Sequence, residues 1–159
     1  MQQWGNSYWE TYSPVVKMLT FRLILAITKI QDLYSKSINF VLAFPQANLK
    51  EYIWMQLPVR FQIDGQTEAE SDKCYFLKLN KNLYGLKQGS FNWYEKLKAS
   101  LVERYFKPLD INPCLYIGNE MIILTYVDDC IIVGPSMDRI DNFVKSMKKG
   151  KENCVLTDI

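Results

Sequence analysis

Hydrophobic residues recur along the chain at helical spacing in three segments. The first predicted helix begins at Ser13-Pro14, with serine as the N-cap and proline at the first helical position, and runs to about Tyr34. Apolar residues surround its whole length, so we expect this helix to be largely buried. The positions that carry the helical spacing are Val16, Leu19, Leu23, Ile27 and Ile30.

Two further helices are predicted in the second half of the chain. One begins at Gly89-Ser90, and its apolar stripe consists of Tyr94, Leu97, Leu101 and Tyr105. Ser136 can cap the other, which has Asp138 in its first turn and Lys148 and Lys149 in its last, as the helix dipole favours. Gly150 is a residue type that typically ends a helix. The apolar face of this last helix is formed by Met137, Ile140, Phe143, Val144 and Met147.

Short apolar runs with β-branched residues predict strands between these helices. A polar, acidic stretch at residues 62–73 is expected to form a surface loop, and Pro108 and Pro113 are expected to interrupt regular structure. The predicted strands are Ile38–Phe44, Tyr52–Leu57, Cys74–Leu79, Cys114–Ile117, Met121–Thr125 and Cys130–Val133. This order predicts an α+β fold, with helices packed on one face of a mainly antiparallel sheet.

The last two strands flank Tyr126-Val127-Asp128-Asp129, which places two adjacent carboxylates at the tip of a hairpin. Neighbouring carboxylates repel each other, and a bound Mg²⁺ relieves that repulsion. The alternative is a solvated turn, because aspartate is common in turns. Taken alone, the pair favours the solvated turn, because short motifs are weak signals.

Composition narrows the possible functions. The 159 residues, 48% of them hydrophobic, suffice for one core and one domain, and the net charge of +2 does not by itself indicate a nucleic-acid-binding protein. The chain has no histidine, which argues against serine-type triads, zinc hydrolases and histidine-containing zinc fingers. The four cysteines lie far apart, and we interpret them as small buried hydrophobic residues in a reducing compartment, although a disulfide stays compatible with the sequence. They are Cys74, Cys114, Cys130 and Cys154.

No membrane partner is expected, because the longest apolar segment, Met18–Ile27, is too short to cross a bilayer and contains Arg22. No secretory signal is evident either, since no basic region precedes the first apolar stretch. An intracellular location, cytoplasmic or nuclear, is therefore predicted.

Four blocks of sequence, in order, carry a resemblance to a known family. They are Tyr8-Trp9-Glu10-Thr11-Tyr12-Ser13-Pro14-Val15-Val16-Lys17, Ala43-Phe44, Leu83-Tyr84-Gly85-Leu86-Lys87-Gln88 and Tyr126-Val127-Asp128-Asp129. Together they resemble the reverse transcriptase of copia-type (Ty1-like) retrotransposons over nearly the whole chain. The resemblance implies a polymerase palm with part of the fingers and no thumb, so that residues 1–159 form one partial reverse transcriptase domain. Its implied partners are an RNA or DNA template with its primer, and a deoxynucleoside triphosphate.

The resemblance also implies a mechanism with two Mg²⁺ ions. Such a pair clamps the attacking and leaving oxygens of an in-line displacement, and needs carboxylates from two places in the fold. Asp128 and Asp129 match the metal-binding pair of the family, but Asn39 occupies the position of its first catalytic aspartate. The asparagine amide is neutral and cannot bridge two cations with charge. Loss of the negative charge of the aspartate is expected to cost several kcal/mol at an effective dielectric constant of about 20. Severely impaired polymerisation is therefore predicted.

Four more positions match the nucleotide-binding site of the family, namely Ala43, Phe44, Gln88 and Tyr126. Phe44 matches an aromatic residue that excludes a ribose 2′-hydroxyl, although packing at a strand end would explain it equally. Gln88 matches a contact to nucleotide and template, although the segment also suits an ordinary helix start. Trp93 is expected in the core rather than stacked on a base.

The competing interpretation is a remnant without catalysis that binds nucleic acid or a partner. The surplus of aromatic residues and the C-terminal lysines at 145, 148, 149 and 151 motivate it, although such lysines also suit a solvated, frayed end. A third possibility is a translated relic that has no function. Oligomeric state, template preference and host do not follow from the sequence.

Overall fold

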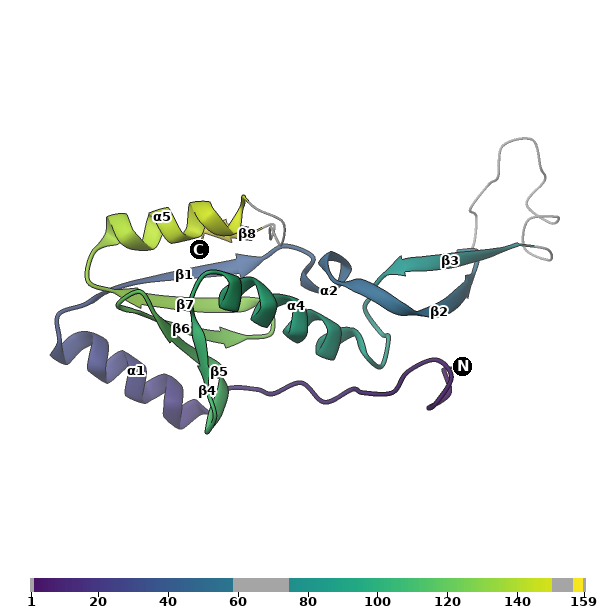
Figure 1. Ribbon diagram of the computed structural model, residues 1–159, viewed down its shortest axis with the longest axis horizontal. Coiled ribbons are helices and arrows are strands. Elements are labelled where there is room, and N and C mark those ends of the chain that lie inside the picture. Colours follow the sequence, from purple (N-terminus) through teal and green to yellow (C-terminus); the bar gives the residue numbers. More distant parts are fainter. Residues whose placement is uncertain (1, 59–74, 150–155, 159) are drawn as a thin grey trace.

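The computed structural model of the chain describes residues 2–58, 75–149 and 156–158 (Figure 1). Within these residues the chain forms a six-stranded sheet, a separate two-stranded hairpin and four helices, and every strand pair is antiparallel. The elements in chain order are α1 (Met18–Ile30), β1 (Tyr34–Phe40), α2 (Ala43–Gln46), β2 (Asn48–Gln56), β3 (Phe76–Lys81), α4 (Gly89–Glu103), β4 (Lys107–Leu109), β5 (Asn112–Gly118), β6 (Met121–Tyr126), β7 (Asp129–Gly134), α5 (Met137–Met147) and β8 (Leu156–Asp158).

The large sheet has the strand order β4-β5-β6-β7-β1-β8, and both faces of its central strands are covered. On one face, α4 and α5 pack against residues such as Ile123 and Ile132. On the other, Ile24 of α1 packs against Leu124 and Val133. Because alternate residues of a strand point to opposite faces, β6 and β7 must be apolar throughout, which explains their uninterrupted hydrophobic runs.

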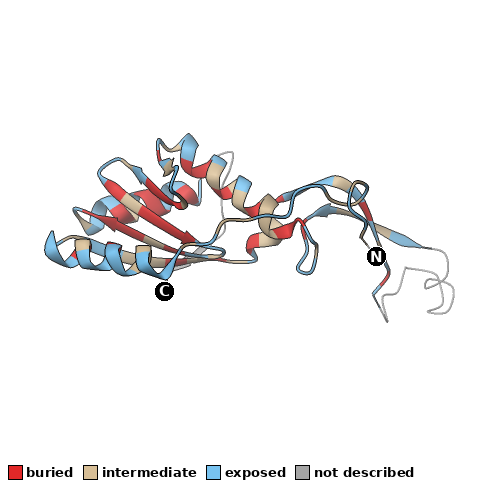
Figure 2. Cartoon of the chain, turned by 90° about the horizontal axis from the view of Figure 1, so that it is seen from below, coloured by how far each residue is buried: buried red, intermediate tan, exposed pale blue. Residues whose placement is uncertain are grey.

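The α+β class and the antiparallel sheet are therefore confirmed. Helices α4 and α5 share one face, and α1 adds a layer on part of the opposite face that the sequence did not predict. Figure 1 shows β2 and β3 extending away from the end of this layered body. Burial is concentrated in the sheet and its helices, while much of the distant hairpin is exposed (Figure 2).

The first helix differs from its prediction at both ends. It begins at Met18, after Lys17, and the predicted start at Ser13-Pro14 is wrong because those residues lie in irregular chain. It ends at Ile30, since Asp32 adopts a left-handed conformation (φ 49°) and Tyr34 already begins β1.

The expectation that this helix is largely buried is also wrong. Ile24 and Thr28 are buried, but the Leu19 side chain is 79% exposed. The helix contacts the sheet through one narrow face, and apolar residues continue around the side that faces away from it.

The predicted strand Ile38–Phe44 is displaced toward the C-terminus relative to β1. The strand ends at Phe40, Leu42 adopts a left-handed conformation (φ 50°), and residues 43–46 form one helical turn that contains Pro45. The hydrophobic run continues through this turn without a break in composition, so periodicity alone did not locate the end of the strand.

The remaining predictions have mixed outcomes. Strands β2 and β3 lie close to their predicted positions, whereas β4 and β8 were missed. Pro108 and Pro113 lie inside β4 and β5 rather than breaking the chain; β4 is at the edge of the sheet, where proline is tolerated. The predicted loop at 62–73, Cys74, Gly150, Lys151 and Cys154 lie outside the described residues.

The predicted starts of the last two helices are confirmed. Helix α4 begins at Gly89, and the Ser136 hydroxyl accepts a hydrogen bond from the backbone N–H of Arg139 at 3.4 Å. Trp93 is 1% exposed, which confirms its place in the core. Tyr105, predicted on the apolar stripe, lies beyond the end of α4 with φ 65° and is 82% exposed.

Candidate functional site

The β6–β7 hairpin turns over two residues and presents its carboxylates at the tip. Tyr126 pairs with Asp129 at the end of the ladder, and Val127 adopts a left-handed conformation (φ 54°) in the turn. Such a conformation costs energy for a β-branched residue, so surrounding contacts must hold it. The indole Nε1 of the buried Trp93 donates a hydrogen bond to the Val127 carbonyl at 2.7 Å, and this bond ties the turn to α4.

Strand β1 brings position 39 to the same place. It runs antiparallel to β7 with Asn39 opposite Asp129, and the backbone N–H of Phe40 donates to the Asp128 carbonyl at 2.7 Å. The Asn39 side-chain amide donates to Asp129 Oδ1 at 3.0 Å. Two segments ninety residues apart therefore meet at one polar point on the sheet.

The orientation of the Asn39 amide follows from its partner. An ionised carboxylate can only accept, so the amide nitrogen faces Asp129 and the amide oxygen is turned away from it. The neutral donor thereby satisfies one carboxylate oxygen without supplying charge. The Asp129 residue is exposed and Asp128 is half-buried, so both remain accessible to solvent ions.

These groups do not make up a site for two divalent cations. The carboxylates come from two adjacent residues of one hairpin, and the third group, at position 39, offers an N–H to one of them. Among the described residues, no cluster of three or more histidine, cysteine, aspartate or glutamate side chains could hold a metal ion. A pair of Mg²⁺ ions requires carboxylates on both sides, which this donor set lacks.

Cys130 lies directly behind the carboxylates on the opposite face of β7. Burial, and secondarily the charge of Asp129, raises the pKa of its thiol well above the ordinary range. The thiol therefore stays neutral and acts as a small core residue, not as a nucleophile or metal ligand. Cys114 is likewise buried and free, so the prediction of buried hydrophobic cysteines is confirmed for these two.

Ala43 and Phe44 follow β1 in the short helix α2. Ala43 is buried, and the Phe44 ring packs partly against the core and 4.9 Å from the ring centre of Tyr84. A side chain at Gly89 would approach the Phe44 ring, because a Cβ built there lies 3.5 Å from it. Phe44 is thus held between the α4 start and the loop that precedes it.

Gln88 is buried at 1% exposure and its amide is fully engaged. It donates to the Ser7 carbonyl at 2.9 Å and to Glu51 Oε2 at 3.3 Å, and it accepts from Gln2 Nε2 at 2.9 Å. Its partners lie in the N-terminal segment and β2, not in the β6–β7 hairpin.

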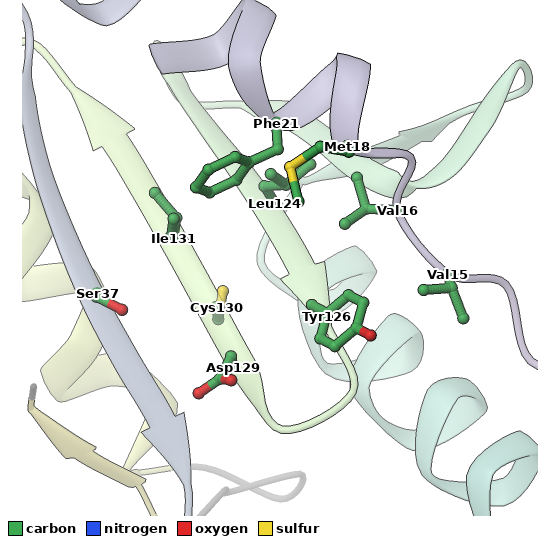
Figure 3. A pocket seen from close by; sticks show the side chains of 10 residues that line it. All are labelled: Val15, Val16, Met18, Phe21, Ser37, Leu124, Tyr126, Asp129, Cys130 and Ile131. Atoms are coloured by element: carbon green, nitrogen blue, oxygen red, sulfur yellow. The ribbon is translucent and has the colours of Figure 1, made fainter.

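A cavity of about 600 Å³ borders Asp129. It lies between the N-terminal segment, α1 and the face of β6 and β7 that carries Asp129 and the 53%-exposed Tyr126. Figure 3 shows these two residues at the hairpin end of the cavity, with Phe21 and Ile131 farther along it. The lining is mostly apolar, so Asp129 is its main charged group.

Two contacts that position the site were not predicted from the sequence. Trp93 was assigned to the core, and its bond to the hairpin turn depends on a tertiary contact that no sequence pattern reveals. The contact between Asn39 and Asp129 required the register of β1 on β7, which the predicted strand boundary placed four residues too late.

None of the described helices is long and apolar enough to cross a bilayer. The chain matches the reverse transcriptase (RNA-dependent DNA polymerase) family over residues 1–159. No solved structure matches it significantly.

Several curated proteins are similar to this chain. The retrovirus-related Pol polyprotein from transposon TNT 1-94 of Nicotiana tabacum is 36% identical over 138 residues, which is 84% of this chain and 10% of that protein. The Pol polyprotein from transposon RE1 of Arabidopsis thaliana is 30% identical over 93% of this chain and 10% of its own length. The Ty1-ER2 Gag-Pol polyprotein of Saccharomyces cerevisiae is 24% identical over 92% of this chain.

The chain spans about a tenth of the length of these relatives. Its match to the family nevertheless extends over its whole sequence and includes the hairpin, position 39 and the segment around Gln88. The chain therefore belongs to the reverse transcriptase family, in the branch formed by the Pol polyproteins of copia-type retrotransposons.

Proposed function

We propose that this chain is part of an RNA-directed DNA polymerase that adds nucleotides to a primer 3′-hydroxyl, and that Asn39 has severely impaired it. The observation that carries the proposal is the convergence of position 39, Asp128 and Asp129 from two strands. A nucleotidyl transfer site needs negative groups from separate segments around its cations. The convergence of these three positions supports the proposal, and one of them, Asn39, lacks charge.

Mg²⁺ is the metal typically used by reverse transcriptases. Asp128 and Asp129 are the residues that would hold it here, and the Asn39 amide leaves them one carboxylate short of a two-ion site. Removing a unit charge from the first coordination shell costs several kcal/mol at an effective dielectric constant of about 20. Since each 1.4 kcal/mol or so changes a rate tenfold, a loss of three or more decades is expected where the cost falls on the transition state.

The nucleotide-binding positions differ in their availability. Tyr126 is half exposed beside Asp129 and is free to meet a nucleic acid or nucleotide, while Phe44 lies with Ala43 at the end of β1. Gln88 can serve in this role only after the N-terminal segment releases its amide. We propose nucleotide contacts for Tyr126 and Phe44, with the buried Ala43 positioning Phe44, and a contact for Gln88 once its amide is released from the N-terminal segment.

Residues 1–159 are proposed to form one partial domain, with the six-stranded sheet as palm and the β2–β3 hairpin as part of the fingers. An RNA or DNA template with its primer, and a deoxynucleoside triphosphate, are the proposed partners. An intracellular setting, cytoplasmic or nuclear, suits the free thiols of Cys114 and Cys130.

A primer-extension assay with Mg²⁺ tests the proposal, using the natural chain, Asn39→Asp, and Asn39→Asp combined with Asp128→Asn. We expect extension by Asn39→Asp alone, because only this variant combines a carboxylate on β1 with both carboxylates of the β6–β7 hairpin. Efficient Mg²⁺-dependent extension by the natural chain would refute the impairment. Extension by none of them, with folding intact, would refute the proposed catalytic site.

A further inference from the structure

Helix α1 carries exposed apolar side chains on the side that faces away from the sheet. Ile24 and Thr28 lie on the side toward the sheet and are buried, whereas Leu19 is 79% exposed and Ile30 82% exposed. In Figure 1, α1 is the outermost layer on its side of the sheet, and no described element covers its far side. A contiguous row of exposed apolar side chains marks an interaction site, whereas scattered ones do not. We call the apolar positions of this far side the outer seam; they are Leu19, Leu23, Ala26 and Ile30.

The spacing of the outer seam is that of a coiled coil. Its members are separated by four, three and four residues, which is the alternation of d and a positions in a heptad. At a rise of about 1.5 Å per residue, the seam is about 17 Å long. Ala26 is small and lies between larger neighbours, so it leaves a hole that a larger side chain of a facing helix can fill. The outer seam therefore suits a second helix that lies along α1.

The charged residues beside the outer seam are basic. Arg22 and Lys29 each precede an a position of the heptad, so they occupy its g positions, and both are exposed. The helix Met18–Ile30 contains no carboxylate. Charges at the e and g positions of a coiled coil select its partner. Because both charges here are positive, they favour acidic residues on the facing helix.

A second copy of this chain fits the outer seam less well. In an antiparallel pair the g positions of the two helices face each other, so Arg22 of one copy would meet Lys29 of the other, and like charges destabilise such a pair. A parallel pair would place Arg22 beside the uncharged Ile27, which offers no ion pair. The charges of α1 therefore oppose or fail to support self-association.

We propose that the outer seam of α1 binds an amphipathic helix of a partner protein whose own apolar seam is flanked by acidic residues. Leucine-sized side chains of the partner fill the space over Ala26, and its carboxylates pair with Arg22 and Lys29. The seam points away from the sheet and from the cavity that Phe21 lines on the other side of α1. Binding there needs neither metal nor nucleotide, so it is independent of the primer-extension result.

The test begins with two synthetic peptides and the natural chain. One fluorescein-labelled peptide of about three heptads has leucine at its a and d positions and glutamate at e and g, and the other has lysine in place of glutamate. Like charges at e and g keep each peptide from pairing with itself. Fluorescence anisotropy gives the two Kd values. We expect the acidic peptide to bind about tenfold more tightly at low salt, because two attractive charge pairs replace two repulsive ones. Added salt is expected to reduce this difference.

The apolar contact is tested by substitution within α1. Leu23→Ala shortens a side chain in the middle of the outer seam and is expected to weaken binding of the acidic peptide about tenfold, as truncation of a central interface contact does. Leu25→Ala is the matched control, since Leu25 is 42% exposed on the same helix but lies off the seam. It is expected to leave the Kd unchanged.

The charges are tested by two double substitutions of equal charge. Arg22→Gln with Lys29→Gln is expected to abolish most of the preference for the acidic over the basic peptide. Lys145→Gln with Lys148→Gln makes the same charge change at the end of α5, on the opposite face of the sheet, and is expected to keep the preference.

Four results would overturn the proposal. They are equal binding of the acidic and basic peptides by the natural chain, equal Kd values for Leu23→Ala and Leu25→Ala, a sedimenting dimer of the natural chain that Leu23→Ala dissociates, and retention on phosphatidylserine-containing vesicles without peptide binding. The dimer would assign the outer seam to a second copy, and the vesicles would assign it to an anionic membrane surface. The peptide comparison needs only the natural chain, so it decides the matter even where a variant fails to fold.

Discussion

Replacing Asn39 by aspartate would turn a neutral hydrogen bond into a contact between like charges. The Asn39 amide nitrogen now lies 3.0 Å from Asp129 Oδ1. Two unit charges at that separation repel by about 1.4 kcal/mol at the dielectric constant of water and by about 5.5 kcal/mol at an effective value of 20. Because Asp129 is exposed, we expect the cost to lie nearer the lower value.

This cost is expected to appear as magnesium-dependent stability. In EDTA, Asn39→Asp is expected to melt at least about 3 °C below the natural chain, since 1 kcal/mol shifts the Tm of a domain this size by roughly 2–4 °C. Mg²⁺ bound between the carboxylates removes the repulsion, and at a hundredfold excess over its Kd it contributes about 2.7 kcal/mol. The natural chain gains much less, because it lacks the third carboxylate.

Thermal unfolding of both forms, in EDTA and in millimolar MgCl₂, measures the difference. Asn39→Ala is the control, since it removes the hydrogen bond without adding charge and is expected to respond to Mg²⁺ as the natural chain does. The reasoning is refuted if Mg²⁺ raises the Tm of the natural chain as much as that of Asn39→Asp, or if the variant loses no stability in EDTA.

Two other perturbations test how the hairpin and core are held. Trp93→Phe deletes the indole donor to the Val127 carbonyl and is expected to cost about 1–3 kcal/mol in urea unfolding, with faster amide exchange in the turn than a Trp9→Phe control shows. Burial raises the pKa of the Cys114 and Cys130 thiols and of the Tyr116 phenol, so these groups stay protonated in the folded chain. In the unfolded chain the same thiols and phenol ionise at their ordinary pKa values of 9.0 and 10.0. Stability is therefore expected to fall as pH rises from 8 through 10; an unchanged urea midpoint would contradict this reasoning.

The spacing of hydrophobic residues located those helices and strands that keep one apolar face along their whole length. The α5 helix has one apolar face and a serine cap, so its start could be read from the sequence, whereas it ends at Met147, before Lys148 and Lys149, which were predicted in its last turn. The ends of α1 and β1 could not, because hydrophobic residues continue past both. Here the chain direction is set by single residues with left-handed backbone, Asp32 and Leu42, neither of which is glycine.

The candidate site was predictable as a set of residues but not as a set of contacts. The resemblance singled out position 39 and the hairpin carboxylates, while the bond between Asn39 and Asp129 follows from strand register. Gln88 shows the converse. Its position matches a nucleotide contact of the family, yet burial of an amide demands partners, and Gln2, Ser7 and Glu51 supply them.

The hairpin owes its position to contacts that do not involve the charge at position 39. The β1–β7 ladder, the Phe40 N–H bond to the Asp128 carbonyl and the Trp93 bond to the turn all persist with asparagine in place. Asparagine even adds a favourable bond where aspartate would add repulsion. A substitution that removes catalytic charge is therefore expected to leave the fold intact or more stable in the absence of metal. Folding and the proposed catalysis are separable at this residue because the carboxylates lie at the solvent-facing end of strands whose interior holds the core.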